Sequence, residues 1–197
     1  MKGTVVLKQG RDKPVRNRHP WIFSGAVARV EGSVEDGDLV RVTDHRGRYL
    51  ATGYINRRSQ IVVRLLAWDA NEAVDVDLWR RRLLRALAGR VRTIEDPDTD
   101  AYRLVHAESD GLPGLIVDHY ASWLVVQCLT LGMARQRNVI IGLLAELIQP
   151  AGIYARDDTD VRRKEGLSLD AGVLWGAEPP DLIEVVEHGR HFWVDVR

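Results

Sequence analysis

The sequence has very little cysteine and no net charge. Its 197 residues include one cysteine, Cys128, and 28 basic residues balance 28 acidic ones. A single cysteine cannot form an internal disulfide, and Cys128 lies in the apolar run WLVVQCLTL, which is typical of a buried side chain. This cysteine usage excludes a disulfide-rich secreted scaffold and favours the reducing cytoplasm.

Long apolar runs are also missing. The first residues, MKGTVVLKQGRDK, hold too few consecutive apolar residues for a secretory signal. No later segment approaches the run of about 18 apolar residues that a transmembrane helix needs. We therefore expect neither export nor membrane insertion.

The neutral total conceals two parts of opposite charge. Residues 1–64 carry 13 Lys and Arg against 6 Asp and Glu, whereas residues 65–197 carry 15 against 22. A zero net charge taken alone argues against nucleic-acid binding, but a net charge of +7 in the first part is typical of a surface that binds polyanions. The chain therefore consists of a basic first part and an acidic second part.

The spacing of apolar residues predicts two domains. Residues 1–70 contain short β-branched runs separated by turn signals such as EDGD and DHRGR, which predicts a small β-barrel. Apolar steps of three and four from Val76 to Val91 predict a helix, and the acidic stretch EDPDTD after it indicates a loop. The predicted fold class is mixed β and α+β: a barrel over residues 1–70, then a linker helix and an α+β domain over residues 71–197.

Cations and aromatic residues gather in the stretch RDKPVRNRHPWIFSGAV. Cations neutralise phosphate and an exposed aromatic face stacks an unpaired base, so this combination on an irregular loop suits RNA. The candidate RNA-binding residues are Arg11, Lys13, Arg16, Arg18, His19, Trp21, Arg57 and Arg58. Phe23 is an alternative stacking residue, and Arg46 and Arg48 form a further basic pair. The competing interpretation is that Trp21, Ile22 and Phe23 pack in the core while the cations are only solvated.

The remaining motifs predict no catalytic residue, no metal and no cofactor-binding residue. Asp157, Asp158 and Asp160 lack the spacing of a calcium loop, so we expect them to pair with neighbouring arginines. The glycines of ESDGLPGLIVDHY open a strand instead of a helix, which indicates turn chemistry. The apolar neighbours of Cys128 raise the pKa of a thiol, so it is a poor nucleophile.

Several strings, in the same order, resemble one family over nearly the whole chain. RNRHPWIFSGAV, GDLVRVTDHRGRYLATGYIN and IVVRLL resemble the PUA-like RNA-binding barrel of the RlmI-type bacterial large-subunit rRNA methyltransferases, which make 5-methylcytosine. ESDGLPGLIVDHY, IYARDDTDVRRKEGL and EVVEHGRHFWVDV are similar to the central α+β domain of the same family.

The resemblance implies the recognition part of an enzyme. Members of the family continue into a Rossmann-like domain that binds S-adenosylmethionine and supplies the catalytic cysteine, and we expect that domain to be absent from this chain. The chain would then bind and position large-subunit rRNA in the cytoplasm, hold no cofactor, and transfer no methyl group by itself. Two alternatives stay open: a stand-alone PUA-type RNA-binding protein, and a protein–protein module whose basic part docks an acidic partner or a second copy in a homodimer.

Overall fold

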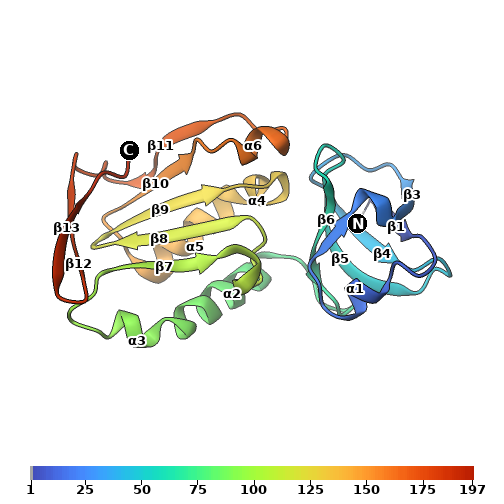
Figure 1. The fold of residues 1–197 in the computed structure, drawn as a ribbon, viewed down its shortest axis with the longest axis horizontal. Helices are drawn as coiled ribbons and strands as arrows, with labels where there is room; N and C mark the ends of the chain where they lie inside the picture. Colours follow the sequence, from blue (N-terminus) through green and yellow to red (C-terminus); the bar gives the residue numbers. More distant parts are fainter. Residues whose placement is uncertain (1) are drawn as a thin grey trace. The chain divides into compact units, whose positions relative to one another are not determined.

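The computed structural model describes residues 2–197, which divide into two compact units (Figure 1). The first unit comprises Met1–Asp75 together with the short segment Lys164–Gly166. The second unit comprises Val76–Arg163 and Leu167–Arg197. The first unit is therefore built from two stretches that lie far apart in the sequence.

The first unit is one six-stranded sheet with the strand order β2-β6-β5-β4-β1-β3. The strands are β1 (Gly3–Leu7), β2 (Trp21–Phe23), β3 (Val27–Gly32), β4 (Leu39–Thr43), β5 (Tyr49–Ile55) and β6 (Ile61–Ala67). Neighbouring strands pair antiparallel except β1 and β4, which run parallel. The one-turn helix α1 (Lys13–Arg16) precedes β2, and the 3-10 helix η1 (Ser24–Ala26) follows it.

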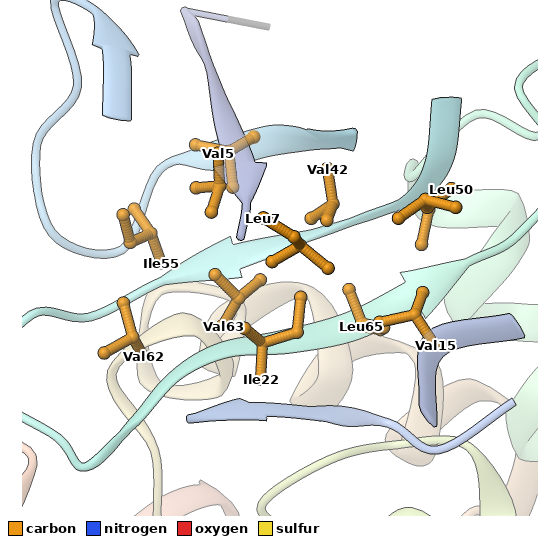
Figure 2. Packing of buried hydrophobic residues seen from close by; sticks show 12 residues of the cluster. Val5, Leu7, Val15, Ile22, Val42, Leu50, Ile55, Val62, Val63 and Leu65 are labelled. Atoms are coloured by element: carbon orange, nitrogen blue, oxygen red, sulfur yellow. The ribbon is translucent and has the colours of Figure 1, made fainter. Parts of the chain in front are cut away.

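The core of this unit is drawn from alternate positions of the strands. Successive side chains of a strand point to opposite faces of a sheet. In β1 this alternation buries Val5 and Leu7 completely, and in β4 it buries Val42. Figure 2 shows Leu7 near Val63 of β6 and Ile22 of β2, so three strands contribute to one apolar cluster.

The predicted closed barrel is wrong. β2 and β3 are the two ends of the sheet, and β2 pairs with β6 while β3 pairs with β1. Because β2 has only three residues and its pairing is broken by a register shift, it offers few backbone groups for a further ladder. The described residues therefore form an open, half-barrel sheet. The strand positions themselves are confirmed, since the four β-branched runs of the sequence overlap β1, β4, β5 and β6.

The second unit is a five-stranded sheet with the order β11-β10-β9-β8-β7. The strands are β7 (Ala101–His106), β8 (Leu115–Tyr120), β9 (Trp123–Cys128), β10 (Gly152–Asp157) and β11 (Asp170–Gly176). The helices are α2 (Val76–Gly89), α3 (Val91–Ile94), η2 (Ala107–Asp110), α4 (Leu131–Arg135), α5 (Arg137–Ile148) and α6 (Val161–Lys164). β9 and β10 are parallel, and α4 and α5 connect them; Figure 1 shows α5 behind the strands.

A separate hairpin completes the chain. β12 (Ile183–Glu187) and β13 (Arg190–Val194) reverse at His188 and Gly189, which both have positive φ. The predicted fold class, a barrel followed by an α+β domain, is thus replaced by two open sheets and a two-stranded hairpin. None of the helices in residues 2–197 has the length and apolarity that crossing a bilayer requires.

Candidate nucleic-acid interface

The cation-rich stretch folds around α1 and β2. Pro14 lies in the first turn of α1, where its missing N–H needs no helical partner, and Val15 of the same helix is buried in the core. The indole N–H of Trp68 donates to the Val15 carbonyl at 2.9 Å, which fixes α1 against the residue that follows β6. Lys13 and Arg18 are exposed on this anchored segment.

His19, Trp21 and Phe23 form a row of edge-to-face rings. The ring centroids of His19 and Trp21 are 5.7 Å apart at an interplanar angle of 81°, and those of Trp21 and Phe23 are 6.2 Å apart at 84°. Ile22, between them in the sequence, points into the core and is 2% exposed, whereas Phe23 is 48% exposed. The core interpretation is therefore right for Ile22 and wrong for Phe23, while Trp21 is half-buried.

A surface pocket of about 360 Å³ lies beside this row, and we call it the α1–β2 pocket. Its lining includes Arg11, His19, Trp21, Phe23 and Gly25. The backbone N–H of Trp21 donates to Nδ1 of His19 at 3.2 Å, so a neutral His19 carries its proton on Nε2. The pocket unites a cation, an imidazole N–H donor and aromatic surface, which are the groups that bind an unpaired nucleotide.

Two of the predicted cations are already held by carboxylates. Arg16 pairs with Asp12 at 2.6 Å and with Asp44 at 3.3 Å. Arg57 pairs with Asp36 at 2.8 Å. These pairs reduce the positive charge that either arginine can offer to a phosphate.

The other cations among the eight candidate residues make no ion pair with a carboxylate of residues 2–197. Arg11, Lys13 and Arg58 are exposed and make no ion pair within residues 2–197. The guanidinium of Arg18 lies over the Trp68 ring, 5.5 Å from its centroid. The structure thus places Arg11 in the α1–β2 pocket, with Lys13 and Arg18 on the adjoining helix and loop.

Arg57 and Arg58 lie in a different turn, between β5 and β6. The N–H of Ser24, which follows Phe23, donates to the Gln60 carbonyl of that turn at 3.1 Å. The turn is therefore next to the Phe23 end of β2. Of its two arginines, only Arg58 is without a carboxylate partner in the described chain.

Asp44 organises the charges around α1. Its carboxylate accepts the backbone N–H groups of Arg46 and Arg48, and it pairs with the Arg48 guanidinium at 2.6 Å. Burial by itself would raise the pKa of Asp44, but these hydrogen bonds together lower it to about 2. Asp44 is therefore ionised at neutral pH and holds Arg16 and Arg48 in place.

A second group of polar residues was missed by the sequence analysis. A pocket of about 300 Å³, which we call the β1–β4 pocket, is lined by Thr4, Val6, Arg29, Glu31, Arg41, Thr43 and Gly47. The available signal was the alternation in LVRVT, in which Arg41 and Thr43 alternate with the core residues Val40 and Val42 and so point to the other face of the sheet. Isolated polar residues in a strand resemble ordinary surface positions, so this alternation did not indicate a binding site.

The acidic and thiol groups of the second unit are structural. Cys128 is fully buried, and burial raises the pKa of its thiol to about 12, which confirms that it is a poor nucleophile. Asp157 accepts the Cys128 N–H at 2.6 Å and pairs with Arg162 at 3.0 Å. Asp158 pairs with Arg156 at 3.2 Å, so the predicted pairing of these acids with neighbouring arginines is confirmed.

The glycines of the DGLPG motif do not fit a S-adenosylmethionine site. Gly111 ends η2 with a φ of 71°, and Gly114 has a φ of 82° just before β8. A Cβ atom on Gly114 would lie 2.3 Å from Oγ1 of Thr130, so the glycine permits close packing. Nucleotide-binding sheets instead place such glycines between a strand and the N-terminus of a helix. We assign no step of methyl transfer to these residues.

Comparison with known proteins finds one domain family and several relatives that are similar to this chain. Residues 5–68 match the PUA-like domain family. The chain is 43% identical over 193 residues to ribosomal RNA large subunit methyltransferase I of Klebsiella pneumoniae and 41% identical over 197 residues to that of Cronobacter sakazakii. These alignments cover 98% and 100% of this chain, but 48% and 50% of the relatives. The chain thus spans about half the length of the curated relatives it matches.

Two solved structures share the fold. A putative SAM-dependent methyltransferase from Streptococcus mutans aligns over 98% of this chain and 48% of its own, with a TM-score of 0.82 and 16% identity. A putative methyltransferase complexed with SAH gives a TM-score of 0.83 over the same shares, also at 16% identity. Such low identity shows the fold alone. The fold match also corrects the predicted fold class. The same fold forms about half of the chain in these two solved methyltransferases. The expected absence of a SAM-binding domain therefore does not follow from the fold.

Proposed function

This chain belongs to the family of ribosomal RNA large subunit methyltransferase I and spans about half the length of those relatives. From this premise we propose that its first unit binds RNA for a methyltransferase that acts on large-subunit rRNA. The observation that carries the proposal is the α1–β2 pocket, where Arg11 meets His19, Trp21 and Phe23. This pocket lies within the PUA-like residues 5–68.

Different groups around the pocket bind different parts of one nucleotide. Arg11 and Lys13 neutralise phosphates, because neither has a carboxylate partner in the described chain. The exposed ring of Phe23 stacks an unpaired base, and the Nε2–H of His19 donates to a base or ribose oxygen. Arg18 and Arg58 extend the positive surface, while Arg16, Arg57 and Trp21 act mainly by holding the segment in shape.

The methylated base and the place of action belong to the same proposal. The resemblance to RlmI-type enzymes favours carbon 5 of a cytosine, and an enzyme that modifies a base must first take it out of the stack. S-adenosylmethionine supplies the methyl group in complete enzymes of this kind. Cys128 is too well buried to attack a base, so these residues bind and position the substrate. A ribosomal RNA substrate supports a cytoplasmic location as part of the same proposal.

A salt titration tests the proposal. Binding of a single-stranded fragment of large-subunit rRNA is measured by fluorescence anisotropy at several salt concentrations. Replacing Arg11→Gln and Lys13→Gln together should reduce the slope of log affinity against log salt by about 1.4, because each phosphate contact to a single strand contributes about 0.7. Arg16→Gln is the matched control, because Arg16 lies in α1 together with Lys13. It should change the slope less, because Asp12 and Asp44 already neutralise Arg16.

Stacking is tested separately with Phe23→Ala. The loss of one base–aromatic contact should cost about 1–3 kcal/mol of binding free energy with little change in the salt slope. If the double variant and Phe23→Ala both bind RNA like the original chain, the α1–β2 pocket is not the RNA site. If the chain binds no RNA but binds an acidic protein, the proposed function itself is wrong.

A further inference from the structure

We propose that the β1–β4 pocket is a second phosphate-binding site, which holds the backbone of the RNA that enters the α1–β2 pocket. The inference rests on the proposed function. The pocket lies on the face of the sheet opposite to the apolar cluster of Val5 and Leu7, because Thr4 and Val6 take the alternate positions of β1, although Val6 is itself only 3% exposed.

The pocket carries an arginine that no carboxylate neutralises. The guanidinium of Arg41 lies over the ring of Tyr49, 5.3 Å from its centroid, and makes no ion pair within residues 2–197. The second arginine of the lining, Arg29, pairs with Glu31 at 2.7 Å, so these two charges cancel. The lining therefore has one net positive charge, and the stacked geometry of Arg41 keeps that charge at a fixed place.

A buried hydroxyl without a partner points to the same ligand. Thr43 lines the pocket and is 7% exposed, yet its Oγ1 has no hydrogen-bond partner in the structure. Buried polar atoms are nearly always hydrogen-bonded, so an orphaned hydroxyl in a pocket needs an explanation. Because Oγ1 of Thr43 has almost no accessible surface, a phosphate oxygen would accept a hydrogen bond from it once the side chain rotates toward the pocket, and a second one from Arg41.

Lys8 connects this pocket with the α1–β2 pocket. It follows β1 at the next position of the series Thr4 and Val6, it is exposed whereas Val6 is buried, and its Nζ donates to the Gly25 carbonyl at 3.0 Å. Gly25 is part of the lining of the α1–β2 pocket. Four residue steps along β1, at about 3.3 Å each, span roughly 13 Å from Thr4 to Lys8. One strand of RNA can therefore run along β1 from one pocket to the other.

The charge of Arg41 is tested with Arg41→Gln, which removes the cation and leaves a shorter, neutral polar side chain. The salt slope for the single-stranded rRNA fragment should fall by about 0.7, the contribution of one phosphate contact. Arg92→Gln is the matched control, because Arg92 is an exposed arginine of α3 that also makes no ion pair within residues 2–197. An unchanged slope in Arg41→Gln, equal to that of Arg92→Gln, would overturn the inference.

The hydroxyl is tested with Thr43→Val, which keeps the shape of the side chain. We expect RNA affinity to fall about tenfold, the size of one hydrogen bond to a charged group. The unfolding midpoint of the free protein should stay the same or rise, because the substitution removes a polar atom that has no partner. A lower midpoint with unchanged RNA affinity would show that Thr43 is structural, and the inference would fail.

Two further measurements are needed. One tells free phosphate from RNA as the ligand of the β1–β4 pocket, and the other tells a failure of this inference from a failure of the proposed function. Amide shifts of Thr43 and Arg41 are followed by NMR with inorganic phosphate and with the RNA fragment. Shifts with phosphate alone, in a chain that binds no RNA, would overturn both the RNA track and the proposed function. Loss of affinity in the Arg11→Gln and Lys13→Gln variant, but not in Arg41→Gln, would overturn only this inference.

Discussion

The guanidinium of Arg64 donates to the carboxylate of Glu165 over 2.7 Å, although 101 residues separate the two in the sequence. Both side chains are buried, at 9% and 3% exposed, and both belong to the first unit, because the segment Lys164–Gly166 is part of it. The side-chain amide of Asn56 donates to the same carboxylate at 2.8 Å. Three groups that are costly to bury therefore depend on one another.

Removing the Glu165 charge should destabilise the first unit strongly. In Glu165→Gln the buried guanidinium of Arg64 is left without a counter-charge, which costs about 3–5 kcal/mol of the free energy of unfolding. Urea denaturation measures this change. Glu187→Gln, at an exposed position of the hairpin, is the control and should change the free energy of unfolding by less than about 0.5 kcal/mol. Equal effects of the two substitutions would contradict the buried ion pair.

Two glycine substitutions should have opposite signs. Gly53 lies in β5, and an added Cβ atom would meet the Arg64 carbonyl oxygen at 2.3 Å, so Gly53→Ala forces the paired strands β5 and β6 apart. Gly142 lies on the exposed side of α5 with nothing within 4 Å of an added Cβ. Gly142→Ala should therefore stabilise the protein by about 0.5–1 kcal/mol. Thermal unfolding of the two variants should show a lower midpoint for the first and a higher one for the second.

The thiol of Cys128 should be inert in the folded protein. Its pKa is raised to about 12 by burial, so almost no thiolate exists at pH 8. A colorimetric disulfide reagent should react with it slowly in buffer and rapidly in 8 M urea, where the ordinary pKa of about 8.5 returns. Rapid reaction of the folded chain would show that the strand β9 opens locally.

Asp44 should make the stability of the first unit depend on acidity. Its folded-state pKa is about 2, below the ordinary value of 3.8, so the unfolded chain takes up the proton first as the pH falls. The stabilisation is complete above pH 3.8 and is lost as the pH falls through about 2. Asp44→Asn should therefore be less stable than the original chain at pH 7, and the difference should shrink toward pH 2. Urea midpoints at pH 7, 4 and 2 give the comparison, and a constant difference would contradict it.

Local patterns predicted the strands of the first unit better than its cationic segment. β-branched runs located four strands of the first sheet, but the cationic stretch that was expected to be an irregular loop contains the one-turn helix α1 and the short strand β2. The hairpin at His188 and Gly189 is likewise a local feature, because that pair supplies the positive φ values of a tight reversal. These features depend on neighbours in the sequence.

What the sequence did not reveal depends on distant partners. Arg16 and Arg18 are alike in the sequence, but Arg16 is held by Asp44, 28 residues away, while Arg18 stacks on Trp68. The β1–β4 pocket needs the register of β1, β3 and β4, which composition does not encode. Barrel closure failed for the same reason, because it depends on whether the end strands can pair.

The place of β1 between β3 and β4 has a consequence for the nascent protein. β1 is synthesised before both of its partners, which end at Gly32 and Thr43, 25 and 36 residues after Leu7. At a synthesis rate of about 5–20 residues per second, the strand waits roughly 1–5 s with both of its edges unpaired and roughly 2–7 s for its second partner. During that interval its apolar residues are open to wrong partners, so early chaperone contact with the emerging strand would protect the yield of folded protein.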